Sequence, residues 1–284
     1  MGTHLGIAQS CLRILDTPGA AGIERLSTKE LRDQFLAQGL FQAGEVNLAY
    51  TSLDRLVVGG VMPVADTVLP GFAEFGTRYF TERRELGILN IGGEGAVSVG
   101  GQRYVLAPFD FLYVGLGEPD IVFESTSGAC PAFYLASAPA HHKYPSARLE
   151  RSEAQVIELG EAANVNRRRI VRYLGGGRIQ SCQLVMGITE VLDGSVWNTL
   201  PPHTHSRRSE IYLYFDMDDR VVLHLMGAPD ATRHLVVRNR EAVLSPRWSL
   251  HMGVGTGSYK FLWAMAGENQ EFGDVDAVDL GTLM

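Results

Sequence analysis

The feature that most constrains the fold is a long series of short apolar runs separated by glycine, proline and aspartate. The runs are rich in Val, Ile, Leu, Tyr and Phe, and the chain contains 32 glycines. They cover residues 55–61, 78–80, 87–91, 96–99, 104–106, 111–114 and 121–123, and then 182–191, 210–215, 221–226, 234–237, 241–244 and 259–266. Many short strands bounded by turn residues are typical of β-sandwiches and β-barrels. The pattern therefore predicts an all-β chain.

The two halves of the chain resemble each other, which predicts two copies of one structural unit. The aligned segments are 83–85 with 207–210, 108–117 with 246–255, and 133–136 with 261–264. In the second of these pairs, proline, a polar ring and two glycines recur at identical offsets, so that Tyr113 corresponds to His251. We therefore expect two tandem β-barrels.

A helix is predicted near the N-terminus, where the residues of a capping box are present. Ser27 can accept a hydrogen bond from the backbone of Glu30, and the Glu30 side chain can accept one from the backbone of Ser27. Leu26 and Leu31 stand at the positions that often pack together across such a helix start. Gly39 is expected to end the helix.

These patterns suggest a division of the chain into four parts. We expect residues 1–45 to form an N-terminal arm and helix, and residues 46–140 the first barrel. Residues 141–174 are more polar and are interpreted as a linker, and residues 175–284 as the second barrel. The predicted fold class is all-β, with two tandem jelly-roll barrels and an N-terminal helix.

The composition argues against nucleic acid or an anionic membrane as the main partner. The net charge is −7, whereas both partners require a basic surface. Three single cysteines, Cys11, Cys130 and Cys182, provide no disulfide framework and suit a reducing compartment. The first residues lack a signal-peptide pattern, and no run is long and apolar enough to cross a membrane. We expect a cytoplasmic protein.

The segment HTHSRRSE, residues 203–210, predicts a metal site. His203 and His205 lie two residues apart, so their side chains share one face of a strand. Glu210 follows at an odd offset, and the polar residues 206–209 must therefore break the strand for all three to converge. His251, after a proline turn, is the fourth candidate ligand. Three imidazoles and one carboxylate suit a first-row divalent ion such as Zn, Fe, Mn, Ni or Co.

The first half of the chain lacks these ligands, and we expect its barrel to be metal-free. The segment 77–81, just before Arg83, contains no histidine, and a tyrosine stands at the position aligned with His251. Glu85 is interpreted as a salt-bridge partner of Arg83 or Arg84. Two further histidines, His224 and His234, are interpreted as packing or surface residues.

The motif HxHxxxxE followed by PxxxxH resembles the metal-binding motifs of the cupin superfamily. A narrower resemblance is to the 5-dehydro-4-deoxy-D-glucuronate isomerases, also called 4-deoxy-L-threo-5-hexosulose-uronate ketol-isomerases. It is carried by segments in the family's order at residues 54–63, 82–87, 90–93, 166–168, 197–205, 245–251 and 267–270. The resemblance implies a bicupin fold, with a degenerate metal-free first barrel and a metal-binding second barrel.

The resemblance also implies a function. The reaction would interconvert 5-dehydro-4-deoxy-D-glucuronate and 3-deoxy-D-glycero-2,5-hexodiulosonate in pectin degradation. It implies a cytoplasmic homohexamer with one Zn²⁺ per chain. The family's metal ligands carry over to His203, His205, Glu210 and His251, the same four that the spacing indicates.

The substrate is acidic, so arginines are candidates for binding its carboxylate, because their planar donors can pair with both oxygens. Arg168 is the first choice, followed by Arg167 and Arg207. Other candidates are listed by role: Gln183, Asn198 and Tyr212 for the hydroxyl groups, Trp197 for an apolar wall, and Glu268 for the general base.

Two other functions fit the same motif. Three histidines and a glutamate can hold redox-active iron, which suggests an iron-dependent cupin dioxygenase. A non-enzymatic cupin that binds a sugar acid is the second alternative. No basic helix-turn-helix segment is visible, which argues against a DNA-linked sensor.

Overall fold

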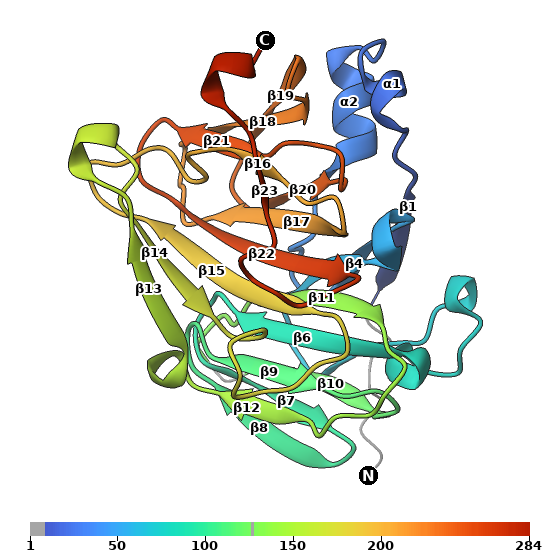
Figure 1. The fold of residues 1–284 in the computed structure, drawn as a ribbon. Coiled ribbons are helices and arrows are strands. Elements are labelled where there is room, and N and C mark those ends of the chain that lie inside the picture. Colours follow the sequence, from blue (N-terminus) through green and yellow to red (C-terminus); the bar gives the residue numbers. More distant parts are fainter. Residues whose placement is uncertain (1–8, 126–127) are drawn as a thin grey trace.

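A computed structural model describes residues 9–125 and 128–284, and within them two large sheets pack face to face (Figure 1). Each large sheet has a smaller sheet on its outer side, so that the molecule consists of two β-barrels. The predicted all-β, two-barrel fold is confirmed. No described helix is both long and apolar enough to cross a bilayer.

The first barrel, drawn in blue to yellow-green in Figure 1, is built from a seven-stranded and a four-stranded sheet among the described residues. The large sheet has the order β1 (Ser10–Leu15), β3 (Val46–Thr51), β4 (Val57–Val61), β11 (Phe133–Pro139), β6 (Arg84–Asn90), β9 (Phe111–Val114) and β12 (Ala147–Leu149). The small sheet has the order β5 (Thr67–Val68), β10 (Ile121–Ser125), β7 (Gly95–Val99) and β8 (Gln102–Leu106).

The second barrel repeats this plan. Its large sheet has the order β13 (Gln155–Leu159), β14 (Arg168–Arg172), β15 (Val185–Val191), β22 (Lys260–Gly267), β17 (Arg208–Phe215), β20 (Glu241–Ser245) and β2 (Leu36–Ala37). Opposite it lie β19 (Ala231–Val237), β18 (Val222–Ala228) and β21 (Met252–Gly255), and β16 (His203–Thr204) pairs with β23 (Asp276–Ala277).

Short 3₁₀ turns connect many of the strands. They are η1 (Leu53–Arg55), η2 (Ala73–Phe75), η3 (Phe80–Arg83), η4 (Arg151–Glu153), η5 (Ala162–Asn164) and η6 (Leu280–Thr282). The prediction of a strand at 78–80 is wrong, because this segment is a bend that leads into η3.

Alternation along the strands explains how two large sheets share one core. On β17, Ile211 and Leu213 face the first barrel, while Tyr212 and Tyr214 face the interior of their own barrel. Tyr134 of β11 belongs to the same shared core as Ile211 and Leu213. Strands that are buried on both faces lack a polar face, and β17 is buried at every position.

The strand order confirms the internal repeat but corrects its register. The series β4-β11-β6-β9 in one large sheet matches β15-β22-β17-β20 in the other. By this match, β9 corresponds to β20 and β10 to β21. Tyr113 lies in β9, whereas His251 directly precedes β21. The alignment of Tyr113 with His251 was therefore wrong, although both halves do repeat one unit.

The N-terminal segment joins the two barrels. Strand β1 extends the first large sheet, whereas α1 (Ala20–Ile23), α2 (Thr28–Phe35) and β2 lie on the second barrel (Figure 1). Ser27 and Glu30 form both hydrogen bonds of the predicted capping box. The helix ends at Phe35 rather than at Gly39, because the chain enters β2 before it reaches the left-handed turn at Gly39, where φ is 70°.

The segment 141–174, interpreted as a linker, contains three strands that belong to the two barrels. Strand β12 pairs with β9 of the first barrel, and β13 and β14 extend the large sheet of the second. The hydrophobic periodicity of these strands is weak because β13 is an edge strand that is mostly exposed.

Glu85 has a different role from the one predicted, because it does not pair with Arg83 or Arg84. It is completely buried and accepts hydrogen bonds from the Tyr113 hydroxyl at 2.8 Å and from the backbone N–H groups of residues 182–184 at 2.7–2.9 Å. Arg84 instead donates to the side chain and carbonyl of Ser137 and to the carbonyl of Arg55. Glu85 thus fastens the start of the second barrel to the first.

Candidate metal centre and adjoining cavity

Three separate elements of the second barrel bring the four candidate ligands together. His203 lies in β16, and His205 follows it directly. A turn at Ser206 and Arg207 interrupts the chain, and β17 then begins at Arg208 and carries Glu210. Because this turn interrupts the strand, Glu210 can face the same side as His205 despite the odd offset between them. His251 is placed beside His203 by a backbone bridge.

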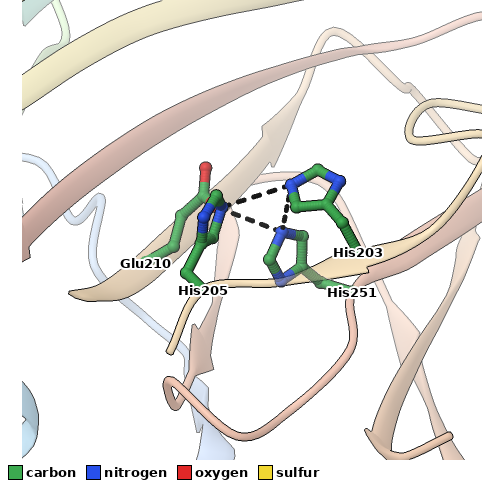
Figure 2. Close-up of side chains that lie close together, drawn as sticks. All are labelled: His203, His205, Glu210 and His251. Atoms are coloured by element: carbon green, nitrogen blue, oxygen red, sulfur yellow. Dashed lines mark hydrogen bonds and ion pairs between the residues drawn. The ribbon is translucent and has the colours of Figure 1, made fainter. Parts of the chain in front are cut away.

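The ligand atoms of these residues converge on one point (Figure 2). His203 Nε2 lies 3.2 Å from His205 Nε2 and 3.1 Å from His251 Nε2. Glu210 Oε2 lies 3.1 Å from His205 Nε2 and 3.2 Å from His251 Nε2. All four ligand atoms lie within 4.8 Å of one another.

The chemistry of this cluster suits a cation. His205 Nδ1 lies 3.0 Å from the Asp274 carbonyl oxygen, which can only accept, so Nδ1 carries the proton and Nε2 presents its lone pair to the centre. Burial and the neighbouring His205 lower the pKa of His203 to about 3, and burial holds the pKa of His251 well below 6.5. The donor atoms of the four residues thus face one another around a point where a cation could bind them all.

The spacing fits a first-row metal ion. With bonds of about 2.0–2.1 Å, tetrahedral ligands lie about 3.3–3.4 Å apart and neighbouring octahedral ligands about 2.8–3.0 Å apart. Four of the six separations are 3.1–3.2 Å and fall between these values, and all six are within 4.8 Å. The four residues could thus hold such an ion with or without further open positions.

A cavity of about 310 Å³ opens beside the centre. His203, His205 and Glu210 line one part of it. Most of the remaining wall is apolar and consists of Leu159, Ile170, Phe261, Trp263, Met265, Phe272 and Val275. A small molecule in this cavity would lie against both the candidate ligands and the apolar wall.

Three of the predicted substrate-binding residues line this cavity. They are Arg168, Asn198 and Tyr212. Arg168 donates to the Asn166 carbonyl and has no carboxylate partner among the described residues. The Asn198 amide is already engaged, because Oδ1 accepts from the backbone of Gly253 and Nδ2 donates to the Tyr214 hydroxyl.

Other predicted residues do not line the cavity. Arg207 is exposed and pairs with Asp274 and Asp276, and Arg167 lies in a separate surface groove. The Gln183 side chain donates to the Pro139 carbonyl at the junction of the barrels. Sequence reasoning could not see these partners, because each lies far away along the chain.

The proposed general base and the proposed apolar wall are also displaced. Glu268 is exposed and is not part of the cavity wall. The tryptophan in the wall is Trp263 of β22, not Trp197. Alternation could have indicated this, since Phe261, Trp263 and Met265 share one face of a predicted strand.

The two histidines outside the predicted metal site, His224 and His234, differ in burial. His224 is completely buried, and its Nδ1 lies 2.7 Å from the Tyr214 hydroxyl. Burial lowers the pKa of His224 to about 3. His234 is exposed. Neither belongs to the ligand cluster.

Comparison with known proteins gives consistent relatives over nearly the whole chain. The sequence model of the KduI/IolB family matches residues 35–280. A 4-deoxy-L-threo-5-hexosulose-uronate ketol-isomerase from Opitutus terrae is 54% identical and covers 94% of this chain and 98% of its own length. Enzymes of the same name from Escherichia coli O127:H6 and Bacillus pumilus are 48% and 49% identical, with 93% and 92% of this chain covered and 97% and 96% of their own.

Solved structures share the fold at low sequence identity. An IolB-like protein from Salmonella typhimurium has a TM-score of 0.61 and 16% identity, with 76% of this chain and 84% of the other covered. Oxalate decarboxylase from Lactobacillus farciminis has a TM-score of 0.53 and 11% identity, with 79% and 78% covered. These similarities support the two-barrel architecture.

Proposed function

Since this chain belongs to the KduI/IolB family, we propose that it is the ketol-isomerase that interconverts 5-dehydro-4-deoxy-D-glucuronate and 3-deoxy-D-glycero-2,5-hexodiulosonate in uronate and pectin breakdown. Relatives that are 46–54% identical over most of the chain carry the ketol-isomerase name. The observation that carries the proposal is the convergence of His203, His205, Glu210 and His251 beside a cavity of suitable size.

We propose that these four residues hold one Zn²⁺ per chain. The donor set of three imidazoles and one carboxylate and the spacing of the ligand atoms support a first-row divalent ion. When bound, such an ion would polarise the substrate carbonyl and hold the adjacent oxygen. The Asp274 carbonyl fixes the tautomer of His205 that such binding needs.

Arg168 is proposed to bind the substrate carboxylate. Its guanidinium lies in a mostly apolar cavity, and burial lowers its pKa. A partly buried cation without an ionic partner is destabilised, so an anionic ligand would supply the missing charge. The substrate, with its carboxylate at one end and its aldehyde at the other, fits a cavity that has Arg168 and the ligand cluster in its walls.

The isomerisation moves a hydrogen from the carbon that bears the hydroxyl to the aldehyde carbon, and a proton between their oxygens. Burial, together with the charge of Glu210, keeps the pKa of Tyr212 well above 10, so Tyr212 is available as a hydrogen-bond donor rather than as a base. The apolar wall of Phe261, Trp263 and Met265 excludes water from the reacting carbons.

The proposal is tested with the purified protein and 5-dehydro-4-deoxy-D-glucuronate. We expect conversion to the ketone product, which NMR can monitor. Elemental analysis should find zinc near one equivalent per chain. His203→Ala and His251→Ala should lose metal affinity by far more than the roughly 10- to 100-fold typical of an outer-sphere substitution, and lose activity with it.

Circular dichroism and thermal unfolding serve as controls that each variant still folds. Full activity in either histidine variant would refute the site. Iron-dependent oxygen uptake without isomerisation would favour a dioxygenase instead.

A further inference from the structure

Arg208 is a buried cation next to the metal-ligand cluster. It begins β17, two residues before Glu210, and its side chain is only 1% exposed. Its guanidinium donates to the Glu271 carbonyl at 2.8 Å and to the Asp274 carbonyl at 2.9 Å. Both acceptors belong to the segment 268–277, which we call the C-terminal strap.

One acceptor of Arg208 is shared with a metal ligand. The Asp274 carbonyl oxygen accepts from Arg208 Nη2 and also lies 3.0 Å from His205 Nδ1. A carbonyl has two lone pairs and can accept both hydrogen bonds. The same oxygen thus contacts both Arg208 and the ring of a candidate metal ligand.

The same strap forms part of the cavity wall. Phe272, Gly273 and Val275 line the cavity beside the ligands, and Asp276 lies in β23, which pairs with β16. The two bonds from Arg208 hold the strap on both sides of Phe272 and Gly273. Displacement of the strap would therefore move both the wall and the acceptor of His205.

We infer that Arg208 is a positioning residue of the metal centre, acting through the Asp274 carbonyl on His205. This inference rests on the proposed metal site. A planar guanidinium can reach two carbonyls at fixed angles, whereas an ammonium group is a point donor on a flexible stem. Outer-sphere partners of metal-bound histidines commonly change metal affinity by about 10- to 100-fold when removed.

Two other arginines provide matched controls. Arg84 begins β6 of the first barrel, is also buried, and donates to backbone carbonyls, but it lies in the barrel without the ligand cluster. Arg207 adjoins Arg208 and binds the same strap from outside, through the carboxylates of Asp274 and Asp276. The first control measures the general effect of losing a buried arginine, and the second the effect of loosening the strap from its surface.

The experiment compares Arg208→Lys and Arg208→Met with Arg84→Met, Arg207→Ala and the parent chain. Affinities for Zn²⁺ and Co²⁺ are measured by competition with a chromogenic chelator, and the visible spectrum of the Co²⁺ form reports the coordination geometry. We expect both Arg208 variants to bind either metal about 10- to 100-fold more weakly and to show an altered Co²⁺ spectrum. Arg84→Met should retain the parent affinity and spectrum, and Arg207→Ala, which leaves both carbonyl contacts of Arg208 in place, should change them far less than either Arg208 variant.

The outcomes are separable. A parent chain that binds neither metal refutes the proposed site itself. Parent-like affinity and spectrum in folded Arg208 variants overturn the inference while leaving the site intact. Failure of both Arg208 variants to fold, with a folded Arg84→Met, also counts against it, since Arg208 would then serve the fold and not the centre.

Discussion

Glu85 and Glu210 are both buried carboxylates near the start of a central strand, but they face opposite sides of their sheets. Glu85 is the second residue of β6 and bonds at the junction of the barrels, whereas Glu210 is the third residue of β17 and faces the barrel interior. Because side chains alternate along a strand, one position of offset decides whether a carboxylate fastens two barrels or joins a metal centre.

At the residue scale, Arg168 can be tested by conservative substitution. Arg168→Lys should retain a positive charge but lose bidentate pairing, and Arg168→Met should lose both. We expect Arg168→Met to lower kcat/KM by roughly 10- to 150-fold, since hydrogen bonds to charged groups contribute about 1.5–3 kcal/mol. Steady-state kinetics with the uronate substrate measures this change.

Arg167→Met is the control for this prediction, because Arg167 is exposed outside the cavity. Equal losses in the two methionine variants would argue against a specific role of Arg168.

A second residue-scale prediction concerns pH. Burial lowers the pKa of His224 in the folded chain to about 3, whereas the ordinary value, which applies to the unfolded chain, is 6.5. The unfolded chain therefore binds the proton more readily, and stability falls as the pH decreases from about 6.5 towards 3. Above 6.5 the group is neutral in both states and has no effect.

Denaturant unfolding at several pH values checks this expectation. The substitution His224→Gln removes this titrating group. It should reduce the slope of the unfolding free energy against pH by up to about 1.4 kcal/mol per pH unit between about pH 3 and 6.5. An unchanged slope would contradict the prediction.

At the scale of elements, the boundaries are decided by contacts between strands as much as by local sequence. Helix α2 begins at the predicted capping box but stops at Phe35, where the chain pairs with β20 as β2. In the expected linker, β12 and β14 attach to different barrels. Local signals thus placed the start of the helix, and pairing with distant strands decided its end.

The segment 182–184 illustrates such a connection. Its backbone N–H groups donate to Glu85, so Glu85→Ala would leave buried donors without an acceptor. We expect this substitution to lower the free energy of unfolding by at least about 3 kcal/mol. Urea unfolding measures the loss, and Glu82→Ala, which removes a surface ion pair with Arg78, should lower the free energy of unfolding far less.

At the scale of the whole molecule, the two barrels share one hydrophobic core. Met186 of β15 is fully buried in this shared core, and a Cβ added to Gly87 of β6 would lie 2.1 Å from its sulfur atom. The large sheets are therefore in close contact. The residues of each large sheet that face the other barrel are buried only because the other large sheet covers them. The first barrel supports the second even though the candidate ligands all lie in the second.

This contact predicts cooperative unfolding. The parent chain should unfold in one calorimetric transition, and Met186→Ala should lower its free energy of unfolding by about 2–5 kcal/mol without splitting the transition. Scanning calorimetry compares the calorimetric and van't Hoff enthalpies. Two resolved transitions in the parent chain would show that the barrels unfold separately.

The sequence alone was sufficient for the features that depend on local order. Strand-length apolar runs predicted the all-β class, the capping box predicted the start of α2, and HxHxxxxE predicted that His203, His205 and Glu210 converge, whereas His251 joins them through a bridge between segments distant in the chain. These signals are local because alternation, capping and the HxH spacing act over a few residues.

Only the tertiary structure decided which other residues surround the centre. Arg168 reaches the cavity while Arg207 is paired with Asp274, and Trp263 forms the wall while Trp197 does not. Each outcome depends on a partner or a strand that is remote in the chain, such as the strap that meets Arg208 more than sixty residues away. Strand pairing and burial bring these groups together, and a single sequence carries no local signal for such contacts.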